Sequence, residues 1–296
     1  MELIDAKTIL SSYTDKGWFG AHYNMNLYKG CPHGCIYCFS RNECYQIQNF
    51  DQVRAKKDAL QILERELKTK RRHGAVITGS MSDPYNPCEA EYRLSRGALS
   101  LFDRYQYGVV ILTKSNLVLR DLDLLCRIKA HSPVAVNFTI TCADDQLARL
   151  IEPNVCSSSD RFAAIKTLSE AGVNCGVLLM PVLPFVNDTP ENIAGLVEKA
   201  AAAGAKWIEA GRAFEVTMRA NQRQYFYDRA DELFPGLRQT YISAFGGQYA
   251  CVSPYDRALK KIFRTACDRH HILYRGEAMA RFIHEPYEVK QLSFFS

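Results

Sequence analysis

The 296-residue chain contains no long apolar run: no stretch approaches the roughly 18 consecutive apolar residues that a membrane-spanning helix needs. Its first residues, Met1 to Asp5, lack the basic segment followed by an apolar run that marks a secretory signal. Internal repeats, low-complexity tracts and flexible linkers are also absent from the sequence. These absences predict a cytoplasmic protein without a membrane partner.

The chain also lacks a strong charge of either sign. The formal net charge is +5, and the pI near 8.6 falls short of the value above about 9 that is typical of nucleic-acid-binding domains. Two short basic runs, at 68–72 and 260–264, resemble solvated helix ends more than phosphate sites when taken alone. The charge therefore permits a nucleic-acid partner without indicating one.

Cysteine, by contrast, is abundant. The eleven cysteines are odd in number and spread over the whole chain, whereas disulfide frameworks belong to small secreted domains. We interpret four of the scattered ones as buried free thiols, because their surroundings are apolar: Cys126, Cys156, Cys175 and Cys267. Three others, at positions 31, 35 and 38, form a tight group that needs a different explanation.

Short apolar runs alternate with longer amphipathic segments over most of the chain. The predicted strands are 75–78, 109–113, 134–140, 175–180 and 207–210, and the predicted helices are 51–70, 91–105, 119–130, 160–171 and 192–203. Near-continuous apolar strands separated by helices indicate a parallel sheet covered on both faces. About six such units are too few for an eight-fold barrel. An open barrel of six βα units or a doubly wound sheet fits the pattern, with the chemistry at the carboxyl ends of the strands.

The alternation ends near residue 212. Segments 217–233, 237–245 and 254–269 have helical patterns without intervening strands. We therefore predict a core over residues 1–212, a helical C-terminal extension over 213–284 and an exposed tail over 285–296.

The segment Gly30 to Phe39 places Cys31, Cys35 and Cys38 within eight residues. A 4Fe-4S cluster normally has four thiolate ligands, so three would leave one iron with open positions, which suits catalysis. A structural zinc site instead needs four ligands, usually in two separated pairs, and His33 is awkwardly placed to complete one. Cys44 remains open as a fourth ligand for zinc or for the cluster.

The spacing Cys-x3-Cys-x-aromatic-Cys, just after a first strand, resembles the defining motif of radical S-adenosylmethionine (SAM) enzymes. Further blocks occur in order at 26–31, 82–89, 113–115, 120–122, 152–153 and 181–188. Together they resemble the spore photoproduct lyase-like branch of that superfamily, often labelled "DNA repair photolyase". The fold that this resemblance implies is α/β, a partial (β/α)6 TIM-type barrel.

The resemblance also implies a chemistry. SAM would chelate the open iron of the 4Fe-4S cluster, and one electron from a reductant such as flavodoxin or ferredoxin would cleave SAM into methionine and a 5′-deoxyadenosyl radical. The protein would then act on damaged or modified nucleic acid. Two alternatives stay open: a protein or small-molecule substrate for the same chemistry, and a non-catalytic protein that binds an Fe-S cluster or zinc.

Several residues are expected, on this resemblance, to contact the cofactor. Lys114 would reach the SAM carboxylate, Asp83 and Glu89 lie in the region that binds the SAM amino group, and Tyr37 would lie near the adenine. Asn137 and Thr139 share one side of a strand and are expected to meet the ribose. The predicted cofactor-binding set is Tyr37, Phe39, Ser80, Ser82, Asp83, Lys114, Asn137 and Thr139. Glu152 is expected either to orient substrate or to cap a helix.

One position departs from the lyase pattern. Ser80 stands where the lyase has a cysteine that returns a hydrogen atom to the product radical, and an O–H bond is too strong for that role. Cys142 and Cys88 are therefore the candidate hydrogen donors, with Cys142 better placed just past a strand. The resemblance to the family does not by itself imply the lyase's own repair reaction.

The chain ends in Gln291, Leu292, Ser293, Phe294 and Phe295, followed by a serine. This segment resembles the short peptide with which bacterial repair and replication proteins dock onto the sliding clamp. An extended tail would offer its leucine and paired aromatics to apolar pockets and its glutamine to hydrogen bonds. The alternative is a tail whose aromatics pack on their own domain.

Overall fold

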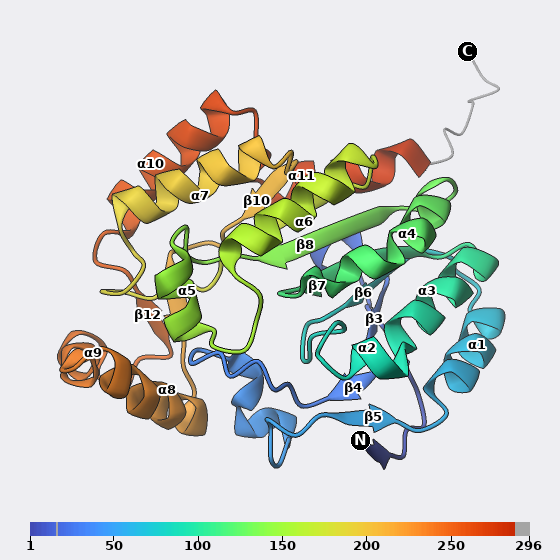
Figure 1. The fold of residues 1–296 in the computed structure, drawn as a ribbon, viewed down its shortest axis with the longest axis horizontal. Helices are drawn as coiled ribbons and strands as arrows, with labels where there is room; N and C mark the ends of the chain where they lie inside the picture. Colours follow the sequence, from blue (N-terminus) through green and yellow to red (C-terminus); the bar gives the residue numbers. More distant parts are fainter. Residues whose placement is uncertain (16, 288–296) are drawn as a thin grey trace.

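The computed structural model describes residues 1–15 and 17–287, and its centre is a seven-stranded sheet in the order β10-β9-β8-β7-β6-β3-β2 (Figure 1). Neighbouring strands from β3 to β10 are parallel, and β2 joins β3 antiparallel at one edge. The strands are β2 Leu10–Ser12, β3 Tyr23–Met25, β6 Ala75–Thr78, β7 Gly108–Thr113, β8 Val134–Thr139, β9 Cys175–Leu178 and β10 Trp207–Glu209. Six parallel strands that do not close on themselves confirm the predicted partial barrel.

The central strands are apolar because both of their faces are covered. Every residue of β7 and β8 is buried. Amphipathic helices follow the strands and cover the outer face of the sheet (Figure 1). They are α1 Ala59–Thr69, α2 Glu89–Tyr92, α3 Leu94–Tyr105, α4 Leu122–Lys129, α5 Asp145–Ile151, α6 Ser158–Glu170 and α7 Pro190–Ala202. Two predicted helix ends are confirmed. α6 is followed by Gly172, which has a φ of +83°. At the start of α7, the Thr189 side chain accepts a hydrogen bond from the backbone amide of Asn192.

One predicted helix begins later than expected. The sequence predicts a helix from Asp51, whereas α1 starts at Ala59 in the structure. The strand β5 (Arg54–Lys56) lies within the residues between these two starting points. β5 pairs with β1 (Glu2–Ile4) and β4 (Tyr28–Lys29) in a second, three-stranded sheet. A three-residue strand in a charged segment has no usable periodicity, and its partner β1 lies far back along the chain.

The C-terminal part packs against the barrel. Its helices are α8 Ala220–Leu233, α9 Leu237–Phe245, α10 Asp256–Arg269 and α11 Gly276–His284. β11 (Glu215–Thr217) pairs antiparallel with β12 (Ala250–Val252), and α8 and α9 lie between these two strands in the chain. α10 packs on α7, and α11 packs on the short helix η1 (Trp18–Gly20). His284 donates through Nε2 to the Phe19 carbonyl, 2.9 Å away, inside this contact. This strand pair was not predicted, and the domain division at residue 212 stays a prediction.

The structure describes only the first three residues of the predicted tail, and its boundary at residue 285 stays a prediction. Residues Glu285–Tyr287 form a short helix, η5, and the Tyr287 hydroxyl donates to the Lys129 carbonyl at 2.7 Å. The proposed clamp-binding segment, 291–295, lies outside the described residues, so that interpretation stays a prediction. None of the helices in the described part of the chain has the length and apolar character needed to cross a membrane.

Candidate active site

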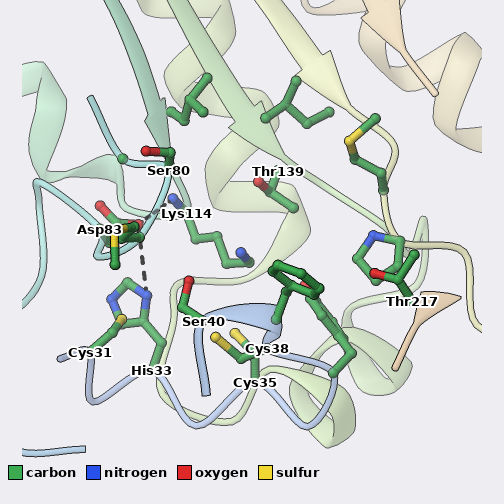
Figure 2. A pocket seen from close by; sticks show the side chains of 18 of the residues that line it. Cys31, His33, Cys35, Cys38, Ser40, Ser80, Asp83, Lys114, Thr139 and Thr217 are labelled. Atoms are coloured by element: carbon green, nitrogen blue, oxygen red, sulfur yellow. Dashed lines mark hydrogen bonds and ion pairs between the residues drawn. The ribbon is translucent and has the colours of Figure 1, made fainter. Parts of the chain in front are cut away.

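A cavity of about 450 Å³ opens at the carboxyl ends of the parallel strands. Five of the parallel strands contribute lining residues where they end: Ser80 to Asp83 after β6, Thr113 and Lys114 at β7, Thr139 at β8, Met180 after β9 and Gly211 after β10. Figure 2 shows Ser80, Asp83, Lys114 and Thr139 above the loop that carries the three cysteines. This is the edge at which the fold pattern predicts chemistry.

The cysteine loop forms the floor of this cavity, and Cys31, Cys35 and Cys38 all line it (Figure 2). Distant backbone shapes the loop. The Cys31 amide donates to the Phe50 carbonyl at 2.8 Å, and the Ile36 amide donates to the Ile151 carbonyl at 3.0 Å. Gly30 has a φ of +85°, and a Cβ there would lie 2.5 Å from the Gln52 carbonyl oxygen. The loop therefore depends on the fold around it.

The donor set fits an iron-sulfur cluster with three protein ligands. Burial raises the pKa of the Cys31 thiol to about 12, and it also raises the pKa values of Cys35 and Cys38. Thiols in such surroundings become thiolates only beside a strong positive charge, such as a metal centre. Among the described residues no three His, Cys, Asp or Glu side chains are arranged to bind a single metal ion, which gives the zinc alternative no support. In a cluster each thiolate binds its own iron, so the three sulfurs need not converge.

The role of Cys44 as a fourth ligand gains no support from the structure. Its side chain is exposed, it does not line the cavity, and its sulfur accepts a hydrogen bond from the Arg219 guanidinium at 2.9 Å. The cavity wall therefore offers three cysteines.

Lys114 places a positive charge above the cysteine loop (Figure 2). Its Nζ lies 5.7 Å from the centroid of the Tyr37 ring. Burial lowers the pKa of this amine, but the neighbouring Cys35 and Glu152 outweigh that effect, so its pKa is raised overall. Lys114 is therefore a cation at neutral pH, suited to an anionic group in the cavity.

Asp83 lines the cavity, but its carboxylate is occupied by the protein. It accepts hydrogen bonds from the Tyr85 amide at 2.8 Å, the Thr113 hydroxyl at 2.7 Å and the Lys114 amide at 2.7 Å. His33 approaches it from the cysteine loop, with Nδ1 3.7 Å away. Asp83 thus joins the ends of β6 and β7 at the cavity wall, and its contact with the SAM amino group stays a prediction.

Two other polar residues predicted near the SAM amino group, Ser82 and Glu89, also make contacts within the protein. The Ser82 hydroxyl donates to the Gly30 carbonyl at 2.5 Å, so this residue fixes the start of the cysteine loop. Glu89 is fully buried, pairs with Arg120 at 2.6 Å and accepts a hydrogen bond from Tyr28. The structure places Glu89 in a buried ion-pair network away from the cavity.

Glu152 forms a buried triad with Tyr37 and Arg161. The Tyr37 hydroxyl donates to one carboxylate oxygen, and the Arg161 guanidinium lies 2.6 Å from the other. Burial raises the pKa of Glu152, but the charges of Arg161 and Lys114 more than offset this and lower it overall. Glu152 is the C-cap residue of α5, with its backbone amide donating to the Ala148 carbonyl at 2.8 Å. Its side chain does not line the cavity, and Glu152 is a positioning residue for the cysteine loop.

Sequence reasoning missed Arg161, although one signal was available. Arg161 lies four residues before the buried Ile165 on α6, so helical periodicity places it on the inner face, where an arginine needs a partner.

Three predicted site residues do not reach the cavity. Asn137 is buried in the barrel interior, where it accepts a hydrogen bond from the Trp207 indole at 2.7 Å and donates to a backbone carbonyl. Cys142 is buried behind the cysteine loop, in an apolar cluster with Ile36, and Cys88 precedes α2 and packs on the main core. The structure therefore does not support Cys142 or Cys88 as hydrogen donors, since neither is among the residues that line the cavity.

Seven of the eight predicted cofactor contacts line the cavity: Tyr37, Phe39, Ser80, Ser82, Asp83, Lys114 and Thr139. Ser80 is exposed to the cavity and donates to the Asn24 side-chain oxygen at 3.0 Å. Trp18 from η1 and Thr217 from β11 also line it and were not predicted, because no local pattern relates these segments to the cysteine loop. Among the scattered cysteines, Cys175 and Cys267 are buried as expected, but Cys126 is exposed and Cys156 is only partly buried.

Comparison with known proteins assigns the family. The family model described as "Radical SAM superfamily" matches residues 25–197, and the chain belongs to this superfamily. It is 31% identical over 242 residues to a protein named "Uncharacterized protein Rv2578c" from Mycobacterium tuberculosis, an alignment that covers 79% of this chain and 70% of the relative.

The solved structures show the same fold at low identity. A structure titled "Spore photoproduct lyase complexed with dinucleoside spore photoproduct" matches with a TM-score of 0.67 and 16% identity, over 90% of this chain and 79% of that one. The radical SAM methyltransferase TsrM from Kitasatospora setae matches with a TM-score of 0.53 and 11% identity, over 84% of this chain and 51% of that one. A lyase and a methyltransferase thus share this fold, so the fold alone does not decide the reaction.

Proposed function

We propose that this protein reductively cleaves SAM at a 4Fe-4S cluster held by Cys31, Cys35 and Cys38. The observation that carries the proposal is that these three thiols lie in one loop and line one cavity at the strand ends, where the described residues supply no fourth cysteine. When bound, the reduced cluster and SAM would supply a 5′-deoxyadenosyl radical that abstracts a hydrogen atom from substrate.

The residues of the chain would bind and orient SAM above the loop. The Lys114 ammonium suits the SAM carboxylate, because it is the cation directed over the cysteines. Ser80 and Thr139 offer hydroxyl groups to the adenosyl portion from the ends of β6 and β8, on either side of β7. Tyr37 and Phe39 contribute aromatic surface beside the last cysteine. The surrounding strand ends and η1 would shield the reaction from water.

The proposed substrate is damaged or modified nucleic acid. The shared fold with spore photoproduct lyase supports this class, and the clamp-like segment at 291–295, proposed to bind the sliding clamp, is consistent with it. Ser80 in the cavity wall argues against the lyase's own cysteine-dependent step, so a different lesion or base is expected. A flavodoxin or ferredoxin as reductant and a cytoplasmic location complete the proposal.

Anaerobic reconstitution tests the catalytic claim. The wild-type protein should bind iron and sulfide and release 5′-deoxyadenosine from SAM under dithionite, whereas Cys35→Ala should lose both. Cys44→Ala is the matched control, because its exposed thiol lies outside the cavity, and it should keep both. A fully loaded cluster that yields no 5′-deoxyadenosine would overturn the proposal, and loss of the cluster in Cys44→Ala would make this cysteine a ligand.

The substrate class needs a separate experiment. Oligonucleotides that carry deuterium at candidate damaged or modified bases should transfer it into 5′-deoxyadenosine. Transfer only from a protein or small molecule would contradict the nucleic-acid proposal while leaving the SAM chemistry intact.

A further inference from the structure

A second pocket adjoins the active-site cavity. It has a volume of about 270 Å³ and shares Ala210 and Gly211, the residues just after β10, with the larger cavity. Its remaining lining residues are Arg212, Phe214, Lys260, Phe263, Arg264, Tyr274 and Arg275. The two spaces therefore lie on either side of one short backbone segment.

The lining of this pocket is strongly cationic. Arg212 comes from the loop after β10, Lys260 and Arg264 are one turn apart on α10, and Arg275 immediately precedes α11. No acidic side chain lines the pocket. Asp256 pairs with Lys260 at 2.9 Å, but within residues 1–15 and 17–287 no carboxylate lies within ion-pair distance of the three arginines. Four cations close together, of which one has an acidic partner, repel one another electrostatically. An anion bound in the pocket would reduce this repulsion.

Aromatic side chains hold the pocket in shape. The rings of Phe214 and Phe263 pack edge to face at 5.9 Å, and those of Phe263 and Tyr274 at 5.8 Å. The Arg275 guanidinium lies 6.0 Å from the Tyr274 ring centroid. An apolar floor under cationic side chains lowers the local dielectric and strengthens their attraction for an anion.

We infer that this pocket binds a backbone phosphate of a nucleic-acid strand, next to the nucleotide that enters the active-site cavity; this rests on the proposed function. Arginine forms paired hydrogen bonds with phosphate oxygens, and three arginines surround this pocket. The volume is at the small end for ligand pockets, which suits a phosphate with part of its sugar. SAM carries no phosphate, so the cofactor does not account for the site.

The test measures binding of a fluorescent single-stranded DNA of about 12 nucleotides to the cluster-loaded protein at several salt concentrations. We compare wild type with the double variant Arg212→Gln/Arg264→Gln. The control is Arg269→Gln, an exposed arginine on α10 that does not line the pocket. Loss of this one phosphate contact should reduce the slope of log affinity against log salt by about 0.7, the contribution of each neutralised phosphate on a single strand. Arg269→Gln should keep the wild-type slope.

Three further outcomes separate the possibilities. An unchanged slope and affinity in the double variant, when wild type binds the DNA, would overturn the inference and leave the proposed function standing. A loss of thymidine 5′-monophosphate binding without any effect on the DNA would assign the pocket to a small phosphorylated molecule and overturn the strand proposal. If wild type itself binds no DNA but still releases 5′-deoxyadenosine from SAM, both this inference and the nucleic-acid substrate fail, while the radical chemistry remains.

Discussion

Tyr37 in the cysteine loop donates a hydrogen bond to Glu152, a residue 115 positions later in the chain. Arg161 lies on the other side of the same carboxylate and also donates to the Thr139 carbonyl at 2.6 Å. The loop that carries the three cysteines is thus joined through one buried carboxylate to the end of β8 and to α6. The position of the cysteine loop therefore depends on contacts with the barrel.

Replacing the buried carboxylate should destabilise the fold. Glu152→Gln leaves the Arg161 guanidinium buried without its counter-charge, which typically costs about 3–5 kcal/mol. The free energy of unfolding of the reconstituted protein, measured with urea, should fall by this amount. The control is Glu170→Gln, which removes an exposed pair with Lys166 and should cost at most about 0.5 kcal/mol. Equal losses in the two variants would contradict a positioning role for Glu152.

Removing the Lys114 charge should weaken SAM binding without removing the cluster. Lys114→Met keeps the apolar stem beside Tyr37 but loses a charged hydrogen bond worth roughly 1.5–3 kcal/mol, so the Kd for SAM should rise about 10- to 100-fold. Titration calorimetry measures the affinity, and iron analysis should show wild-type loading. Lys166→Met on the exposed face of α6 is the control. Wild-type SAM affinity in Lys114→Met would refute the assigned contact.

Removing the Cys142 thiol should leave SAM cleavage intact. Its side chain is buried behind the cysteine loop and does not line the cavity, so Cys142→Ala should release 5′-deoxyadenosine within about twofold of the wild-type rate. The lost packing should lower the free energy of unfolding by roughly 1 kcal/mol. If, with substrate present, product formation stops while 5′-deoxyadenosine still appears, Cys142 is a hydrogen donor.

The backbone after β6 requires glycine. Gly79 has a φ of +99°, and a Cβ there would lie 2.0 Å from the Leu112 carbonyl oxygen on the neighbouring strand. Gly79→Ala should therefore lose about 2–5 kcal/mol of unfolding free energy, from left-handed strain together with overpacking. Gly247→Ala is the control, because nothing lies within 4 Å of its Cβ position, and it should change stability by less than about 0.5 kcal/mol. Similar melting temperatures for the two variants would contradict this prediction.

Asp188 should make stability depend on pH. Burial raises its pKa, and the hydrogen bond from Ser253 at 2.6 Å offsets only part of that effect. Because the folded-state pKa lies above the unfolded one, the contribution of Asp188 is most favourable below about pH 4 and is lost as the pH rises through the folded-state value. Asp188→Asn should therefore gain stability relative to wild type between acidic and neutral pH, measured by urea unfolding at both. Asp268→Asn, an exposed control, should show no such change. An equal pH profile for wild type and Asp188→Asn would contradict the prediction.

Local patterns were enough to predict the barrel and its most distinctive loop. Strands such as β7 and β8 are apolar at nearly every position because both faces are buried, so their composition alone marks them. The three cysteines lie within eight residues, so their spacing carries the cluster hypothesis without any tertiary information. The sequence did not predict short strands whose partners lie far away in the chain, such as β5, which pairs with β1, and β11, which pairs with β12.

The sequence by itself determined the order of the βα units, the cysteine triad and the chemical class that the triad indicates, because these depend on composition and short spacing. Only the tertiary structure decided which polar residues reach the cavity. In the structure Asn137 accepts a hydrogen bond from Trp207, and Asp83 accepts one from the Lys114 amide. Arg212, Arg264 and Arg275 line one pocket. These contacts join residues far apart in the chain. Their geometry is set by how the sheet curves and where α10 and α11 pack on it, which no local pattern encodes.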